Sequence, residues 1–410
     1  MNPDNNPFTP GQPVDAEFFT GRTKQVEELR AMVRMARKKR LQVGWISGER
    51  GMGKSSLALF INHLAERHEQ AVVAHVHLGG VKTVDELAQA THLQLLKDNQ
   101  TQRWGKALWD AFGKHIESVD TFGVKFQFKD KGDTLPARAS EFPDALNQIV
   151  RTAGEDREVL LLTFDDINGL ADNPEFSHWL KSMVDGEVTS RKHNHVCLIF
   201  AGLEERLRKM QKANPSVIRV FQPLIHIHPW TTEERENFFR NSFAKGNATI
   251  GKNAIAELAR YSEGLPIVAH QIGHAVWGIA RTEKITLEDV HDGVVVAANN
   301  FGERFLKSDV IQALRSDKYR SILRKIAQRP DWHEIEFSRE QLRSLTVLTA
   351  DEKKTMDNFL NRMRTLGAIV PVKERDRGVY RFATHVHRIY FFLEAREATI
   401  ENGSKNTAAS

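Results

Sequence analysis

Hydrophobic residues in the first 228 positions gather in short runs that alternate with longer segments of mixed polarity. Runs of strand length occupy residues 41–47, 71–78, 158–164, 195–201 and 224–228. Apolar side chains recur every three or four residues in segments 23–40, 55–65, 84–97, 145–153 and 174–184. Strands that alternate with amphipathic helices predict a parallel sheet with helices on both faces.

After residue 230 the pattern becomes almost entirely helical. Thr231 and Glu234 have the spacing of a capping box, which predicts a helix start. Further helices are predicted over 254–261, 266–279, 287–301, 319–328, 339–345 and 351–366. Two strands, 368–373 and 379–382, follow around a charged turn. Three helices and then a hairpin is the order of a winged helix-turn-helix.

The segment from Gly48 to Ser55 reads Gly-Glu-Arg-Gly-Met-Gly-Lys-Ser, between a predicted strand and a predicted helix. This is the pattern of a P-loop, in which glycines let backbone N–H groups surround phosphate oxygens. Lys54 reaches the outer phosphates, Ser55 binds Mg²⁺, and the helix N-terminus favours the same anion. The predicted nucleotide-binding residues here are Gly48, Glu49, Arg50, Gly51, Met52, Gly53, Lys54, Ser55 and Ser56.

A second acidic element follows the apolar run 158–164. Asp165 and Asp166 come directly after it, in the arrangement of a Walker B strand. We expect Asp165 to hold Mg²⁺ together with Ser55, and Asp166 to polarise the attacking water. The alternative is that the two aspartates only cap the next turn. The predicted ligands are thus ATP and Mg²⁺, and the predicted activity is ATP hydrolysis, with Lys54, Asp165 and Asp166 in the catalytic set.

The predicted fold is an α/β P-loop NTPase with an all-α lid and a C-terminal winged helix-turn-helix. The expected domains are an N-terminal arm and ATPase core over residues 1–230, a lid over 231–305 and a winged helix over 306–396. Residues 98–144 are expected to form an insertion, with a strand or hairpin at 123–129. The last segment, 397–410, is expected to be disordered.

Composition limits the compartment, the disulfides and the membrane segments that this sequence is expected to have. The 410 residues carry a net charge of +5, are 40% hydrophobic and include one cysteine, Cys197. No apolar run approaches the ~20 residues of a membrane span, and the N-terminus does not have the pattern of a signal peptide. We therefore expect a cytoplasmic protein that has no membrane partner and no internal disulfide. Four His-x-His pairs lack a clear third ligand, so they do not predict a further metal site.

Several short motifs resemble those of AAA+ and STAND ATPases related to the origin-recognition ATPases. Asn6-Pro7-Phe8, Pro10-Gly11 and Phe19-Thr20-Gly21-Arg22 resemble the segment that enters the ATPase core in that family. The resemblance implies that Phe19, Gly21 and Arg22 lie near the adenine. The alternative is an ordinary helix start at this point.

Two later positions also resemble the family. Gly264-Leu265-Pro266 resembles the G-x-P motif of STAND ATPases, which implies that Pro266 packs on the nucleotide. A proline at a helix start has an equally simple explanation, because its missing N–H needs no partner there. Arg219 resembles the arginine finger that acts on a neighbouring subunit's nucleotide, with Arg191 as a weaker candidate. An ordinary surface arginine is the alternative for Arg219.

One departure from the family concerns the run that ends in Ala201-Gly202. AAA+ proteins usually place Asn, Ser or Thr at this point, where the side chain orients water. Neither Ala201 nor Gly202 can do so, which implies slow hydrolysis or a switch held by bound nucleotide.

The C-terminal region carries much of the basic charge. Residues 308–395 contain 17 Lys and Arg against 12 Asp and Glu. A recognition helix over 351–366 and a basic hairpin would suit duplex DNA. The predicted DNA contacts are Lys354, Asn358, Arg362, Lys373, Arg375 and Arg377. The alternative is that this module packs on its own chain or on a protein partner.

Two functions remain open on these grounds. In the first, the protein is a self-associating, DNA-associated ATPase switch that loads another factor. In the second, it is a signalling scaffold of a bacterial defence system, whose ATP state gates a separate effector without direct DNA binding. Both functions require a protein partner.

Overall fold

The computed structural model describes residues 1–98, 116–118, 127–128, 142–153, 157–189, 195–328, 336–372 and 378–407. The chain forms two compact units. The sheet unit is Pro13–His228, and the helical unit combines Met1–Gln12 with Pro229–Ser410. In the described residues, no helix is both long and apolar enough to cross a membrane.

A five-stranded sheet, in which every paired strand is parallel, forms the centre of the sheet unit. The strand order is β2-β5-β6-β1-β7. The strands are β1 Gln42–Ser47, β2 Ala71–His77, β5 Val159–Asp165, β6 Val196–Gly202 and β7 Leu224–His226. The predicted parallel sheet of a P-loop NTPase is therefore confirmed.

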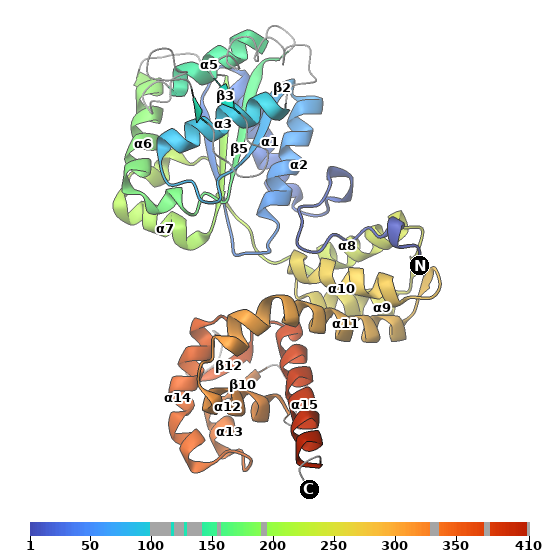
Figure 1. The fold of residues 1–410 in the computed structure, drawn as a ribbon. Coiled ribbons are helices and arrows are strands. Elements are labelled where there is room, and N and C mark those ends of the chain that lie inside the picture. The colour runs from blue at the N-terminus through green and yellow to red at the C-terminus, as the bar shows by residue number, and fades with distance from the viewer. Residues whose placement is uncertain are drawn as a thin grey trace. The chain divides into compact units, whose positions relative to one another are not determined.

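Helices connect these strands and lie on both faces of the sheet (Figure 1). They are α1 Thr23–Arg37, α2 Lys54–His68, α3 Val84–Asp98, α5 Phe142–Ala153, α6 Pro174–Thr189 and α7 Glu204–Ala213. Successive strand residues point to opposite faces, so Trp45, Phe164 and Phe200 share one face and one apolar core with α3, α5 and α6. The other face carries Thr163, which accepts a hydrogen bond from Asn62 of α2.

The insertion predicted over 98–144 is described only in part. β3 Ile116–Ser118 pairs antiparallel with β4 Gln127–Phe128. β4 falls within the alternating segment 123–129, for which the sequence predicts a strand. The rest of that segment lies outside the described residues.

Most of the helical unit follows the last strand of the sheet. Its helices are α8 Thr232–Lys245, α9 Lys252–Ser262, α10 Pro266–Ile279, α11 Leu287–Phe301, α12 Asp317–Ala327, α13 Arg339–Ser344, α14 Ala350–Thr365 and α15 His385–Thr407. The short parallel strands β8 Thr249–Ile250 and β9 Lys284–Ile285 lie between them. Thr231 and Glu234 form the predicted capping box at the start of α8.

The C-terminal elements follow the predicted order, with one strand added. After α12 the chain runs through β10 Glu336–Ser338, α13, α14, β11 Ile369–Pro371 and β12 Val379–Phe382. The three strands form an antiparallel sheet in the order β10-β12-β11. The sequence predicts only the β11–β12 hairpin, because β10 is three residues long and shows no pattern that marks a strand.

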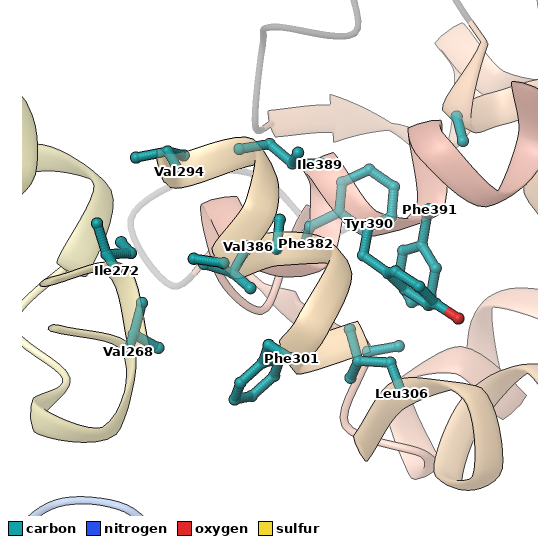
Figure 2. Packing of buried hydrophobic residues seen from close by; sticks show 14 of the residues in the cluster. Val268, Ile272, Val294, Phe301, Leu306, Phe382, Val386, Ile389, Tyr390 and Phe391 are labelled. Atoms are coloured by element: carbon teal, nitrogen blue, oxygen red, sulfur yellow. The ribbon is translucent and has the colours of Figure 1, made fainter. Parts of the chain in front are cut away.

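A single apolar core joins α8, α9, α10 and α11 to the C-terminal elements within the helical unit (Figure 2). The labelled side chains in Figure 2 come from α10, α11, β12, α15 and the π-helix that follows α11, Gly302–Gln312. Gly302 allows the closest approach, since a Cβ there would lie 1.9 Å from Cδ2 of Tyr390. Because this core is continuous, the predicted lid and winged-helix regions pack as one body.

Residues 397–407 of the tail predicted over 397–410 belong to a helix, and 408–410 lie outside the described residues. α15 begins at His385 and continues to Thr407. No proline interrupts this stretch, and extending a formed helix adds one hydrogen bond per residue without a new nucleation step.

The sequence analysis groups the N-terminal arm with the ATPase core, but the first part of the arm packs with the helical unit. Met1–Gln12 belongs to the helical unit, where Phe8 is buried against Phe238 and Phe243. A Cβ on Gly273 of α10 would lie 2.3 Å from the Phe8 ring, so the glycine leaves the space that the ring fills. Backbone N–H of Thr9 donates to His270 Nδ1 at 3.1 Å. One apolar side chain thus anchors the arm.

We predict that Phe8→Ala destabilises the helical unit by about 3–5 kcal/mol, because it leaves a cavity among aromatic rings that cannot collapse onto it. Urea unfolding followed by circular dichroism measures the loss. Val347→Ala is the matched control, since Val347 is 56% exposed and its truncation should change little. An unchanged midpoint for Phe8→Ala would show that the arm is not part of the core.

Candidate functional site

The predicted phosphate loop lies at the carboxyl end of β1, between that strand and α2. Gly51 and Gly53 adopt positive φ angles of 76° and 85°, which only glycine takes up without strain. α2 begins at Lys54 with no side-chain cap, so its first N–H groups are left available for an anion. Gly48 and Met52 are buried, whereas Glu49 and Arg50 are exposed.

Lys54 lies over this loop. Its Nζ donates to the carbonyl oxygens of Gly48 and Glu49, each at 2.8 Å. Burial lowers the pKa of the Lys54 ammonium from its ordinary value, and the nearby carboxylates of Asp165 and Glu49 offset part of that shift. The ammonium is therefore held at the loop by weak neutral acceptors, which a more strongly charged ligand can replace.

Ser55 and Asp165 meet across the sheet edge, although β1 and β5 are separated by β6. The Ser55 hydroxyl neighbours the Asp165 carboxylate and stabilises its charged form, and Asp165 is only 7% exposed. Burial alone would raise the pKa of Asp165, but the neighbouring His75 imidazole and Ser55 hydroxyl outweigh it and hold that pKa below its usual value. The pair supplies a hydroxyl and an ionised carboxylate, which suits Mg²⁺.

His75 is a part of this site that the sequence analysis does not identify. Its Nε2 lies 3.6 Å from Oδ2 of Asp165, and its Nδ1 lies 3.0 Å from Oγ1 of Thr163. Asn62 donates to the same hydroxyl at 2.9 Å. These polar groups form a chain that places the His75 ring beside the Asp165 carboxylate. The available signal was the alternation on β2, which puts His75 on the same face as the register partner Thr163.

Asp166 turns away from the strand direction. It has a positive φ of 55°, and its N–H donates to Oδ1 of Asp165 at 3.0 Å. Its own Oδ1 accepts a hydrogen bond from Nδ2 of Asn168. The two aspartates therefore lie side by side but face different partners, which allows them different tasks.

The entry segment contacts the phosphate loop and α2. Phe19 stacks on Phe60 of α2, with ring centroids 4.2 Å apart. Gly21 and Arg22 both have positive φ, and Arg22 is buried. The Arg22 guanidinium donates to the carbonyl oxygens of Met52 and His228, at 3.4 and 2.5 Å.

Ser56, also predicted to bind nucleotide, accepts a hydrogen bond from the N–H of Val14 at 3.3 Å. Its hydroxyl therefore joins α2 to the entry segment. Contact of Phe19, Gly21 and Arg22 with an adenine stays a prediction.

Arg219 is exposed, on the 3₁₀ turn Val217–Val220 before β7. It is the only one of the two finger candidates within the described residues, because Arg191 lies outside them. Its exposure fits a side chain that reaches another molecule.

Pro266 lies in the helical unit, at the first position of α10. Gly264 before it has a φ of 78°, and a Cβ there would lie 2.5 Å from the carbonyl oxygen of Trp230. The N–H of Trp230 donates to the carbonyl oxygen of Gly264 at 2.8 Å. Close backbone packing thus explains this Gly-Leu-Pro motif within its own unit, and contact between Pro266 and a nucleotide stays a prediction.

The predicted DNA contacts on α14 share one exposed side, which carries Lys354, Asn358 and Arg362. Arg362 also donates to the carbonyl oxygen of Ala313 at 2.9 Å. The hairpin candidates Lys373, Arg375 and Arg377 lie outside the described residues. Within the described part of the chain, no group of three or more His, Cys, Asp or Glu side chains is arranged to hold a metal ion.

Residues 19–199 match the family model of an AAA ATPase domain. None of the curated proteins compared matches the sequence. The fold is similar to that of the Walker-type ATPase PABY2304 of Pyrococcus abyssi, at 16% identity and a TM-score of 0.55, over 92% of this chain and 96% of that one.

It is equally similar to the ORC2 protein of Aeropyrum pernix, solved as ADPNP–ADP complexes. The identity is 12% and the TM-score 0.55, over 96% of this chain and 99% of that one. Both likenesses concern the fold alone, and the family match covers the sheet unit up to residue 199.

We predict that His75→Ala raises the Mg²⁺ concentration needed for half-maximal ATP turnover by about 10-fold or more, because the variant releases the carboxylate of Asp165 from its fixed orientation. A magnesium titration of turnover measures this. His68→Ala, at an exposed position near the end of α2, is the control. If both variants titrate like the parent protein, His75 does not orient Asp165.

Proposed function

We propose that this chain, an AAA ATPase over residues 19–199, is an ATP- and Mg²⁺-dependent molecular switch that associates with duplex DNA and with copies of itself. The contact between Ser55 and Asp165 beside the phosphate loop is the observation that carries the nucleotide part of this proposal. The ADPNP and ADP found with the structurally similar ORC2 protein support it.

Each polar group of the site would have one task. Backbone N–H groups of residues 48–55 and the Lys54 ammonium would bind the phosphates. Ser55 and Asp165 would hold Mg²⁺, which supplies charge neutralisation at the transferred phosphate. Asp166 would orient water and accept its proton. Since Ala201 and Gly202 add no polar side chain at the end of β6, we propose slow turnover.

The charge distribution on α14 supports the DNA part of the proposal, in which α12 to β12 act as a winged helix. Each acid of this helix is paired with a cation from a neighbouring helix. Asp351 pairs with Lys318 and Glu352 with Lys325, at 2.5 and 2.9 Å. Asp357 pairs with Arg339 and Arg343, at 2.7 and 2.9 Å.

Because these acids are neutralised, the exposed Lys354 and Arg362 dominate the field of this face. Met356, Phe359 and Met363 bury the opposite face in the core, so the polar face is the one left for a partner. Duplex phosphates suit a rigid helix with such a face.

We predict that duplex DNA raises ATP turnover of the purified protein several-fold, and that Lys354→Ala/Arg362→Ala removes this rise while basal turnover stays. Lys54→Ala is the blank, and Lys24→Ala, an exposed position on α1, is the control for general loss of positive charge. The rise should weaken with added salt, because phosphate contacts release counterions.

Two other outcomes would contradict parts of the proposal. Turnover that DNA does not change would favour the signalling scaffold that gates a separate effector. Turnover of the parent protein no higher than the Lys54→Ala blank would contradict the ATPase itself and leave a nucleotide-held switch.

Self-association would bring Arg219 to a neighbouring subunit's site. We predict that Arg219→Ala and Lys54→Ala are each inactive alone, and that an equimolar mixture recovers a measurable fraction of turnover. In the mixture, a Lys54→Ala subunit can supply Arg219 to the intact phosphate loop of its neighbour. Lys212→Ala, exposed on α7, should behave like the parent protein. Full activity of Arg219→Ala by itself would exclude the finger.

A further inference from the structure

The loop after β5 carries a third polar residue beside the two aspartates. Ile167 follows Asp166 and is fully buried, and its N–H donates to the carbonyl oxygen of Ala201 at 3.3 Å. This bond ties the loop to the end of β6. Asn168 comes next and projects its amide between the two elements.

The Asn168 amide bridges Asp166 and the residue after β6. Its Nδ2 donates to Oδ1 of Asp166, and its Oδ1 accepts from the N–H of Leu203 at 3.1 Å. One partner can only accept and the other can only donate, so the amide has one orientation that satisfies both. Aspartate in place of Asn168 would keep the second bond and lose the first.

The end of β6 cannot supply this polar group. A Cβ on Gly202 would lie 2.8 Å from Ile167 and 3.0 Å from Trp45, so no side chain fits there without displacing the core. Ala201 is itself 1% exposed and has no polar atom in its side chain. The neighbouring loop, and not the strand, therefore provides the amide next to Asp166.

We propose that Asn168 is the positioning residue for Asp166: it fixes the carboxylate that orients the attacking water and takes the place of the polar side chain that β6 lacks. The inference rests on the proposed ATPase function. Two hydrogen bonds hold Asp166: its backbone N–H donates to Oδ1 of Asp165, and its carboxylate accepts from the amide of Asn168, which sets the direction of that carboxylate. A carboxylate held in this way loses little freedom when water binds.

The expected kinetic signature is a fall in kcat with little change in KM, because Asn168 does not touch the phosphate loop. Asn168→Ala should lower kcat by about 10-fold, the scale seen when groups that orient a site residue are removed. Asn168→Asp should lower it further, since two adjacent carboxylates repel each other. Asn173→Ala is the matched control, because Asn173 bonds the carbonyl oxygen of Lys82 and not an aspartate.

A double-mutant cycle separates positioning from a general structural effect. We would measure kcat and KM for the parent protein, Asn168→Ala, Asp166→Ala and the double variant, with the melting temperature of each. If Asn168 acts through Asp166, replacing Asn168 lowers kcat no further in the Asp166→Ala background. An equal loss in both backgrounds, or a parent-like kcat for Asn168→Ala, would overturn the inference and leave the ATPase proposal intact. A parent protein with no turnover above Lys54→Ala would overturn both.

Discussion

The contact between Ser55 and Asp165 is the constraint on which the rest of the sheet unit depends. The two residues are far apart in sequence and belong to different connections, yet the parallel sheet brings the carboxyl ends of its strands to one edge. A buried carboxylate needs partners, and Ser55 and His75 provide them. The same arrangement that stabilises Asp165 as an ion also leaves a hydroxyl and a carboxylate ready for a divalent cation.

The polar groups near this contact come from several strands and loops, and each makes a hydrogen bond to a neighbour. Thr163, Asn62 and His75 form a hydrogen-bonded chain on one face of the sheet. Asn168 links the loop after β5 to the end of β6. A site of this kind changes little when one charged ligand replaces water, because its groups are oriented in advance.

In the helical unit, one apolar core determines how the elements pack, whereas polar contacts define the site of the sheet unit. Phe8 from the N-terminal arm, Tyr390 from α15 and residues of α8 to α11 all belong to that core. The chain passes between the two units twice, after Gln12 and after His228. A variant that weakens the anchor at Phe8 would therefore affect one of the two connections as well as the core.

Local sequence signals predicted several elements well. Thr231 and Glu234 marked the start of α8, and continuous apolar runs marked β1, β5 and β6, because capping and burial are encoded within a few residues. Local signals did not predict the structure where a partner distant in the sequence determines it. Residues 1–12 contain no periodic pattern. Phe8 is buried because Gly273 has no side chain and leaves space for its ring, which only the structure shows. β10 exists because β12 pairs with it, and three residues alone cannot predict that.

The sequence by itself determined the P-loop fold and the segments that bear Lys54, Ser55, Asp165 and Asp166, since glycine spacing and strand-ending aspartates are local properties of the chain. Only the tertiary structure decided which other side chains surround them. His75 and Asn168 are ordinary residues in the sequence, and their contacts arise from the strand order and from the packing of Gly202 against Trp45 and Ile167. Hydrogen bonds between distant elements depend on distances of a few tenths of an ångström, and those distances exist only once the core has packed.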